Sequence, residues 1–402
     1  MPPYPTMIDP DEALRLVLEA AGPPEAAEVP LDTAGGHCLA EEVRADRDYP
    51  PFPRAMMDGY AVRVADAGST VEVIGEVAAG QEPGIPVTEG RCLEIMTGAA
   101  CPSGTEAVVE KEAVRRDGTR VRLPPSIQAG AHIAAIGSEC PAGAAVLSPG
   151  QPITPLTVAV LASFGRRTVS VFRRPSMAIV TTGAELALPD CDPQPAQIRN
   201  SNGPMLAAMA GQIGIDRPLC LHAEDRVKAI ADAIGRAGRH ELIVISGGVS
   251  AGAYDLVPQA VEAVGAEIVF HKVAQKPGKP FLFARRASQL LFGLPGNPLA
   301  CHLGFHRYVA AAARQREGKP VVRQSFRGRL AAAARPLEGR TFFLLAHAQA
   351  IDCSDPAWEV HPLHSASSAD VFRPCTANCY LRIPPSGITI PAGRVVWFEW
   401  ID

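Results

Sequence analysis

Several acidic and basic side chains in this sequence stand beside glycine and proline, where the chain turns and its backbone can approach a ligand closely. Carboxylates hold Mg²⁺ together with waters and substrate phosphates, and ammonium groups bind oxyanions directly. Together they predict a Mg²⁺-dependent enzyme that acts on a phosphorylated small molecule. The side chains concerned are the carboxylates Asp58, Glu185, Asp225 and Asp255 and the lysines Lys276 and Lys279.

The stretch from Glu241 to Asp255, ELIVISGGVSAGAYD, carries the clearest pattern. Its apolar run Leu242–Ile245 is typical of a short strand buried on both faces of a parallel sheet. Gly247 and Gly248 follow, and Asp255 stands at the mouth of the next helix. A buried strand, a glycine turn and a carboxylate at a helix start indicate an anion or metal–phosphate site. The alternative is that the glycines serve only the geometry of the turn.

Two more loops have ligand-like composition. The segment 276–280, KPGKP, is stiffened by its prolines and can present two ammonium groups to phosphate or another oxyanion. The segment 293–298, GLPGNP, is a second glycine–proline turn at the end of an apolar run. The carboxylates also have structural alternatives, which are helix caps for Asp225 and Asp255 and a solvated turn for Glu185.

The elements that would position these loops lie between Arg174 and about Arg316. Short apolar runs alternate there with amphipathic helical patterns, which indicates a largely parallel, doubly wound sheet with right-handed crossovers. The loops that follow the strands of such a sheet gather at one edge, where ligands bind. We therefore expect these loops to share one site.

The flanking regions have other patterns. From about Val62 to Ile136 short strands alternate with Gly, Pro and Asp-Gly turns, which predicts a small all-β domain with Thr97 at a strand end. A helix is expected after Pro155, with Leu156, Val160 and Phe164 as its apolar positions. The tail from about Val321 alternates apolar and polar residues and predicts a final small β-barrel or sandwich.

Composition excludes some classes of function. A chain of 402 residues suggests two to four domains, and a net charge of −4 gives no reason to expect a nucleic-acid-binding surface. No stretch approaches the roughly 20 apolar residues of a membrane span, and the N-terminus lacks a signal-peptide pattern, so we expect a cytoplasmic protein. The ten cysteines form no CxxC pair, which favours free thiols. His302 and His306 have a metal-ligand spacing without a third ligand, which favours helix packing.

Taken in order, the loops resemble those of the molybdopterin molybdenumtransferase family, the group of MoeA and the gephyrin E-domain. A further resemblance to the last domain of that family lies in SADVFRPCTANCYLRIP, residues 368–384. The likeness extends over essentially the whole chain. The other matching motifs are MDGYA (57–61), IMTGA (95–99), TTGAEL (181–186), SGGVSAGAYD (246–255), KPGKP (276–280) and GLPGNP (293–298).

The resemblance implies a multidomain α/β plus β fold in a homodimer. A MoaB/MogA-like three-layer α/β domain with a mostly parallel sheet would be central, joined by an inserted small β domain, a discontinuous N-terminal domain and a C-terminal β-barrel. The expected ranges are 1–50 with 137–172 for the discontinuous N-terminal domain, 51–136 for the small β domain, 173–318 for the molybdopterin-binding domain and 319–402 for the barrel.

The implied reaction inserts molybdate into adenylylated molybdopterin and releases AMP, with Mg²⁺ required. The molybdopterin adenylyltransferase is a second expected partner, and Asp58 and Thr97 would act across the dimer interface. Catalysis is expected from Asp58, Thr97, Glu185, Asp255, Lys276 and Lys279, contacts to molybdopterin from Gly247, Gly248, Val249, Ser250, Pro295, Gly296, Asn297 and Pro298, and Mg²⁺ ligation from Asp225, Asp255 and Glu185.

The chain departs from the family pattern at two places. Residues 134–139 read AAIGSE, where the family usually has arginines before Gly-x-Asp, and Arg54-Ala55-Met56 lacks the usual small polar residue before MDGYA. These departures keep open a second hypothesis, a binding or scaffold protein that retains the pterin pocket without turnover. A third is the adenylyltransferase that precedes insertion, against which the additional domains argue.

Overall fold

The computed structural model describes residues 4–249, 256–321, 325–351 and 356–401. The chain divides into two compact units. The first comprises Met1–Ala40, Pro152–Thr154 and Val169–Asp402, and the second comprises Glu41–Gln151 and Pro155–Thr168. No helix in the described part of the chain is long and apolar enough to span a lipid bilayer.

The first unit contains a seven-stranded sheet in the order β1-β19-β21-β22-β18-β14-β17. Neighbouring strands are parallel except on both sides of β21, which is antiparallel to β19 and β22. The predicted mostly parallel sheet is therefore confirmed. Its strands are β1 (Thr6–Ile8), β14 (Met177–Thr182), β17 (Leu219–Ala223), β18 (Leu242–Ser246), β19 (Glu267–Val273), β21 (Leu282–Arg286) and β22 (Gln289–Leu294).

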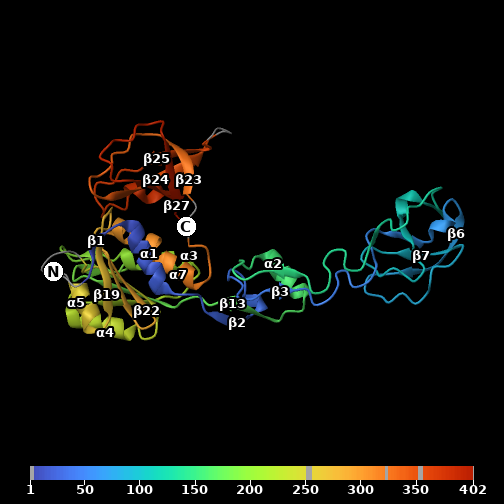
Figure 1. Ribbon diagram of the computed structural model, residues 1–402, viewed down its shortest axis with the longest axis horizontal. Coiled ribbons are helices and arrows are strands. Elements are labelled where there is room, and N and C mark those ends of the chain that lie inside the picture. The colour runs from blue at the N-terminus through green and yellow to red at the C-terminus, as the bar shows by residue number, and fades with distance from the viewer. Residues whose placement is uncertain (1–3, 250–255, 322–324, 352–355, 402) are drawn as a thin grey trace. The chain divides into compact units, whose positions relative to one another are not determined.

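Helices cover both faces of this sheet, which gives three layers (Figure 1). Alternate residues of β14 point to opposite sides, so that Ile179 packs with one group of helices and Val180 with the other. The first group is α1 (Pro10–Ala21), α3 (Asn202–Gln212), α6 (Pro298–Gly304), the π-helical turn η4 (Phe305–Val309) and α7 (Ala310–Arg316); the second is α4 (Val227–Arg236) and α5 (Leu256–Ala263).

Helix α1 begins at Pro10, directly after the capping residue Asp9. Asp9 accepts a hydrogen bond from the Asp11 backbone N–H over 2.8 Å, and Pro10 occupies the first turn, where a missing N–H costs nothing. The buried face consists of Ala13, Val17 and Ala21 and packs on the sheet.

A closed five-stranded barrel follows, as predicted, because β24 pairs with both β25 and β26. A short strand of the central sheet region, β20 (Gln275–Lys276), also pairs with β24. The core of the barrel includes Val360, Leu381 and Phe398. The barrel strands are β23 (Ser325–Leu330), β24 (Thr341–Ala350), β25 (Trp358–Pro362), β26 (Cys379–Ile383) and β27 (Val395–Trp400).

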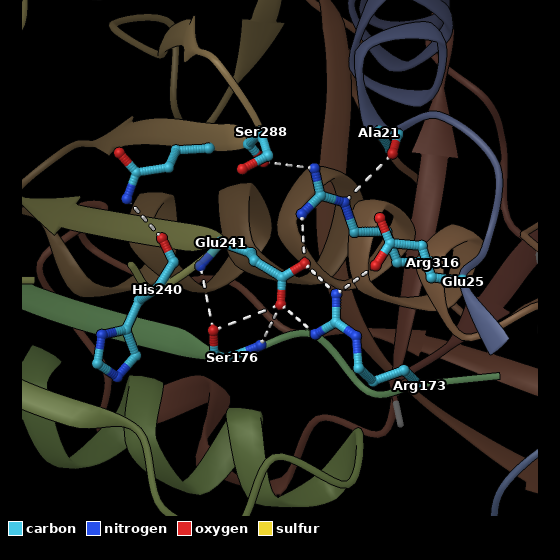
Figure 2. A network of polar contacts seen from close by, with 9 residues as sticks. Ala21, Glu25, Arg173, Ser176, His240, Glu241, Ser288 and Arg316 are labelled. Atoms are coloured by element: carbon cyan, nitrogen blue, oxygen red, sulfur yellow. Dashed lines mark hydrogen bonds and ion pairs between the residues drawn. The ribbon is translucent and has the colours of Figure 1, made fainter. Parts of the chain in front are cut away.

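A polar network lies at the edge of the central sheet where β18 and β22 begin (Figure 2). The Glu241 carboxylate accepts two hydrogen bonds from Arg173, over 2.7 and 2.9 Å, and one from Arg316 over 3.1 Å. Arg316 also donates to the carbonyl oxygens of Ala21 and Ser288. The network thus ties the ends of α1 and α7 to the strands β18 and β22.

The second unit contains a six-stranded sheet in the order β8-β5-β7-β6-β10-β9, which confirms the small β fold expected there. Its strands are β5 (Gly59–Val62), β6 (Thr70–Val77), β7 (Arg91–Ile95), β8 (Ala107–Glu110), β9 (Arg115–Asp117) and β10 (Arg120–Arg122). The second unit also contains two separate two-stranded ladders. They are β3 (Val43–Arg44) with β12 (Ala145–Leu147) and β4 (Arg54–Ala55) with β11 (Ile133–Ala134).

Helix α2 (Pro155–Ser163) corrects one expectation. Leu156 was expected on the apolar face but is 81% exposed, whereas Leu161 is fully buried. The residues of this helix are apolar on every side of its axis, so the spacing of apolar residues does not determine which side faces the core. The four-domain division expected from the family resemblance stays a prediction.

Candidate functional site

The topology brings the predicted loops to one edge of the central sheet. Strands β14, β17, β18 and β22 run in one direction. Strand β19 shares that direction, because both β19 and β22 are antiparallel to β21. The loops that follow all five strands therefore leave the sheet at the same edge, as the sequence predicts.

A cavity of about 1050 Å³ opens among these loops. Its volume is at the upper limit of ordinary small-ligand sites. Nine of the predicted residues line it: Glu185, Asp225, Gly247, Gly248, Val249, Pro295, Gly296, Asn297 and Pro298. Two further predicted residues, Ser250 and Asp255, lie outside the described part of the chain.

Asp225 is held by the loop that follows β14. Thr182 donates its hydroxyl hydrogen to Oδ1 over 2.6 Å, and the backbone N–H of Ala184 donates to Oδ2 over 2.9 Å. The alternative role as a helix cap is not observed, because α4 begins after Arg226 without a side-chain cap. The carboxylate is exposed, so lone pairs of both oxygens remain available to a cation.

Glu185 stands on the same loop as the groups that hold Asp225. Its carboxylate lies over Gly183, since a Cβ atom added there would come within 2.8 Å of Oε2 and 2.9 Å of Oε1. Like Asp225, it is exposed and lines the cavity. The two carboxylates therefore flank the Gly183–Ala184 turn.

The donor set of these two residues fits Mg²⁺. Both supply hard carboxylate oxygens, and Mg²⁺ is usually held by one or two carboxylates with waters and substrate phosphates. Within the described ranges, no three His, Cys, Asp or Glu side chains gather in an arrangement that could hold a metal ion. A two-carboxylate site completed by water and phosphate is compatible with that result.

The turn after β18 needs glycine for steric reasons. Gly247 has a φ of +106°, and a Cβ atom there would lie 2.3 Å from the carbonyl oxygen of Thr182. Its N–H donates to the Leu294 carbonyl over 3.0 Å, which joins this turn to the end of β22. The geometric alternative therefore accounts for Gly247 whether or not a ligand is present.

Gly296 has no such constraint. The nearest atom to a Cβ added there is the Gly247 Cα at 3.8 Å, and its φ is not positive. Because the residue is exposed and lines the cavity, the absence of a side chain leaves room for a ligand to approach the backbone.

Asn202 is a cavity residue that the sequence does not reveal. The side chain is buried and donates to the hydroxyl oxygen of Ser246 over 2.8 Å and to the carbonyl of Gly296 over 2.7 Å. It thereby joins the start of α3 to the two loops after β18 and β22. Its Oδ1 atom is buried without a hydrogen-bond partner among the described residues.

Arg199 is a second cavity residue without a sequence signal. It donates from Nε to the Cys191 carbonyl over 3.2 Å and pairs with Asp192 over 3.2 Å. The stretch 186–201, which carries Arg199, contains no glycine and lacks the pattern that marked the other loops. A basic side chain in it could be placed at the site only from the structure.

A segment of the barrel region completes the cavity wall. Asn297 donates to the hydroxyl oxygen of Ser368 over 2.7 Å, and the backbone N–H of Leu299 donates to the Ser368 carbonyl over 3.0 Å. These bonds hold the barrel segment against the loop after β22. Ala369, Val371 and Phe372 then line the same cavity.

The two predicted lysines do not line the main cavity. Lys276 lines a separate recess of about 130 Å³ together with Ser365, Ser367 and Ser368. Its ammonium nitrogen is 5.5 Å from the centroid of the Phe342 ring. Lys279 is exposed and lines neither space. Pro280, at the end of the lysine loop, does line the main cavity.

Asp58 and Thr97 belong to the second unit, and the structure brings them together. The Thr97 backbone N–H and hydroxyl both donate to Asp58 Oδ1, over 2.7 and 2.8 Å. These two hydrogen bonds hold the pKa of the Asp58 carboxyl below its ordinary value. Asp58 is therefore an exposed carboxylate that stays ionised at neutral pH.

The two places where the chain departs from the family pattern are also neighbours. Arg54 is the strand partner of Ala134, and its guanidinium pairs with Glu139 over 2.5 Å. The guanidinium group of Arg54 thus lies beside the stretch that lacks the usual arginines.

His302 and His306 take part in helix packing, as predicted. Their rings stack with centroids 6.1 Å apart, and His302 Nδ1 lies 2.7 Å from the Tyr380 hydroxyl of the barrel.

The chain matches two family models in succession. Residues 8–165 match the MoeA N-terminal region (domain I and II), and residues 178–315 match the probable molybdopterin binding domain. Together the two matches take in Asp58, Thr97 and the loops of the central sheet that line the cavity.

Two curated relatives of the chain carry the same name. A molybdopterin molybdenumtransferase of Staphylococcus aureus is 32% identical over 96% of this chain and 93% of its own. One from Staphylococcus epidermidis is 35% identical over 78% of this chain and 77% of its own. A solved structure of the molybdopterin biosynthesis MoeA protein from Pyrococcus horikoshii has a TM-score of 0.81 at 28% identity, covering 98% of this chain and 99% of that one.

Proposed function

This chain belongs to the MoeA family of molybdopterin molybdenumtransferases, and we propose that it inserts molybdate into adenylylated molybdopterin and releases AMP in a Mg²⁺-dependent reaction. As a member of that family it is a transferase of molybdenum cofactor biosynthesis. The adenylylated substrate, the release of AMP and the need for Mg²⁺ are the parts that we propose.

One observation carries the proposal: the loops after the parallel strands enclose a single cavity of about 1050 Å³ with carboxylates on one side and open glycine backbone on another. A substrate with two ring systems joined by phosphates needs a site of this size. The exposed backbone of Gly296 suits a phosphate, because N–H groups and a missing Cβ allow close contact.

Asp225 and Glu185 would hold Mg²⁺, and Asp255 is the third ligand that the sequence predicts. When bound, the ion would neutralise charge on the phosphoanhydride and on the leaving AMP. Thr182 and the Ala184 N–H keep the Asp225 carboxylate in one orientation. This orientation lowers the entropic cost of binding the ion, because the carboxylate needs no further ordering.

Lys276 and Lys279 remain the proposed contacts to the oxyanions. The recess that Lys276 shares with Ser365, Ser367 and Ser368 offers an ammonium group together with hydroxyl donors. Such a donor set suits a small tetrahedral oxyanion such as molybdate.

We further propose that the enzyme is a homodimer and that Asp58 and Thr97 contribute to catalysis from the partner subunit, as the family resemblance implies. The molybdopterin adenylyltransferase is the proposed supplier of the substrate. The hydrogen-bonded pair of Asp58 and Thr97 supports a role for both residues in one place.

The test is transfer of the metal itself. Purified protein incubated with adenylylated molybdopterin, molybdate and Mg²⁺ should yield a low-molecular-weight pterin fraction that contains molybdenum in a 1:1 ratio. Tight pterin binding without any transfer would favour the scaffold hypothesis. Formation of the adenylylated compound from ATP and molybdopterin would instead favour the adenylyltransferase hypothesis.

A further inference from the structure

Phe372 is an aromatic residue with an unusual position at the mouth of the main cavity. It lines the cavity, yet 81% of its surface is exposed. A large apolar ring that is exposed to this extent gains little burial energy within the chain. Exposure beside a ligand cavity therefore suggests that the ring is covered when a ligand is present.

The backbone that carries Phe372 is fixed. Asp370 accepts hydrogen bonds from the backbone N–H groups of Ala366, Phe372 and Arg373, over 2.9, 3.3 and 3.4 Å. These bonds hold the pKa of the Asp370 carboxyl below its ordinary value, so the turn persists at neutral pH. The ring is thus presented from a preformed turn, which reduces the ordering cost of binding.

The turn is also attached to the central loops. Ser368 receives one hydrogen bond at its hydroxyl oxygen from Asn297 and another at its carbonyl oxygen from the backbone N–H of Leu299. Asn297 itself lines the cavity. Phe372 therefore has a defined place relative to the loop after β22.

The surroundings of the ring are suited to a flat, apolar group. Val371, Ile198, Leu186 and Leu256 line the same cavity as the carboxylates Asp225 and Glu185, and Leu186 directly follows Glu185 on the loop after β14. A cavity with both apolar and charged walls suits a ligand that combines a ring with phosphate.

We propose that Phe372 is a binding residue that stacks on a heteroaromatic ring of the substrate. This inference rests on the proposed function, which supplies two such rings, the adenine and the pterin. The shared chemistry is a flat π-system that can lie in an offset arrangement on the phenyl face. Loss of one aromatic stacking contact of this kind weakens binding roughly 5- to 100-fold.

The experiment compares Phe372→Ala and Phe372→Trp with the wild-type protein. Turnover of adenylylated molybdopterin should show a KM raised roughly 5- to 100-fold in Phe372→Ala, with kcat changed less than threefold, and recovery in Phe372→Trp. Ile388→Ala serves as the control, because Ile388 is 74% exposed in the barrel region and lines neither described cavity.

The affinities of Phe372→Ala and of the wild-type protein for AMP, for a pterin and for inorganic phosphate show which of the two rings Phe372 contacts. A loss of affinity for AMP alone assigns Phe372 to the adenine, and a loss for the pterin alone assigns it to the pterin. Phosphate affinity should not change in either case. Unchanged KM and unchanged affinities for both rings in Phe372→Ala would overturn the inference.

An error in the proposed reaction can be distinguished from an error in the inference about Phe372. If the wild-type protein shows no turnover, the proposed reaction is wrong, but the binding measurements still test the stacking contact. If the wild-type protein binds neither AMP nor the pterin, the inference about Phe372 is overturned as well.

Discussion

Thr182 donates its hydroxyl hydrogen to Oδ1 of Asp225 over 2.6 Å, which joins the ends of the neighbouring strands β14 and β17 at the edge of the cavity. The Ala184 N–H binds the other oxygen, so the carboxylate is oriented from the β14 side. An exposed carboxylate that is already oriented is well suited to hold a cation opposite a phosphate.

We predict that Asp225→Ala raises the Mg²⁺ concentration for half-maximal activity by at least roughly tenfold, because one of the three carboxylates proposed to hold the ion is lost. The cost to folding should be roughly 1 to 3 kcal/mol, because two hydrogen bonds are lost and the hydroxyl of the buried Thr182 loses this acceptor. Mg²⁺ titrations of activity measure the first effect, and urea denaturation measures the second.

Glu224→Ala is the matched control for that prediction. Glu224 precedes Asp225 and pairs with Arg226, with about 70% of each side chain exposed, and it does not line the cavity. Its removal should leave the Mg²⁺ dependence unchanged. Equal Mg²⁺ dependence of Asp225→Ala and the wild-type protein would show that Asp225 does not hold the ion.

Gly247 and Gly296 should respond differently to alanine. Gly247→Ala forces a Cβ atom to within 2.3 Å of the Thr182 carbonyl at a φ of +106°, so it should destabilise the fold by at least about 2 kcal/mol. Gly296→Ala meets no atom closer than 3.8 Å and should change stability by no more than about 0.5 kcal/mol.

The same two substitutions also test the binding of the substrate. Gly296→Ala should fold normally yet bind the phosphorylated substrate more weakly, because its methyl group occupies space at the cavity wall. Thermal denaturation and isothermal titration with adenylylated molybdopterin measure the two effects. Wild-type affinity in Gly296→Ala would mean that the substrate does not approach this backbone.

The pKa of Asp58 should depend on Thr97. Both hydrogen bonds from Thr97 favour the ionised carboxylate, so Thr97→Val, which keeps only the backbone donor, should move the pKa of Asp58 back toward its ordinary value of 3.8. Thr97→Ser should leave it low. Carbon-13 NMR of labelled aspartates measures this, with Asp58→Asn identifying the resonance.

The sign of the linked stability follows from that shift. Because the folded-state pKa of Asp58 lies below the ordinary value, its contribution is present above that value and disappears as the pH falls through the folded-state pKa. An unshifted Asp58 resonance in Thr97→Val would show that the hydroxyl does not stabilise the carboxylate.

Glu241 should matter for stability rather than for catalysis. Glu241→Gln leaves the Arg316 guanidinium, whose side chain is 12% exposed, without its opposite charge. We expect a loss of about 3 kcal/mol, the lower limit for breaking a buried pair, since Arg173 is 41% exposed. Glu267→Gln, which breaks an exposed pair with Arg285, should cost less than about 1 kcal/mol.

The effect of Glu241 should also depend on pH. Burial raises the pKa of this carboxyl, but the hydrogen bonds and charges of Arg173, the Ser176 N–H and the charge of Arg316 outweigh burial, so the pKa lies below its ordinary value of 4.5. The stabilisation is therefore present above pH 4.5 and declines as the pH falls through the folded-state pKa. Urea denaturation of both proteins at neutral and acidic pH measures the difference, and a constant difference would contradict it.

The sequence predicts those parts of the site that depend on local backbone chemistry. Gly247 follows a buried strand and must adopt a positive φ, so its place at a strand end can be read from the pattern. The direction of the strands then determines that Gly247, Gly296 and Asp225 share one edge. None of this requires knowledge of side-chain packing.

Other parts depend on tertiary contacts and carry no local signal. Asn202 looks like an ordinary first residue of a helix, and only the fold brings it to Ser246 and Gly296. Phe372 lies in the stretch 368–384, whose resemblance to the last domain of the family does not place it at the cavity, and only the fold brings it there. Leu156 was misassigned because its helix is apolar on all sides, which removes the periodicity that identifies a buried face.

The proposed reaction is tested most directly by the release of AMP from adenylylated molybdopterin, measured with and without molybdate and with and without Mg²⁺. We predict rapid release by the wild-type protein only when both are present, and a shifted Mg²⁺ requirement in Asp225→Ala. Release that is equally fast without Mg²⁺ and molybdate, or no release although the substrate binds, would contradict it.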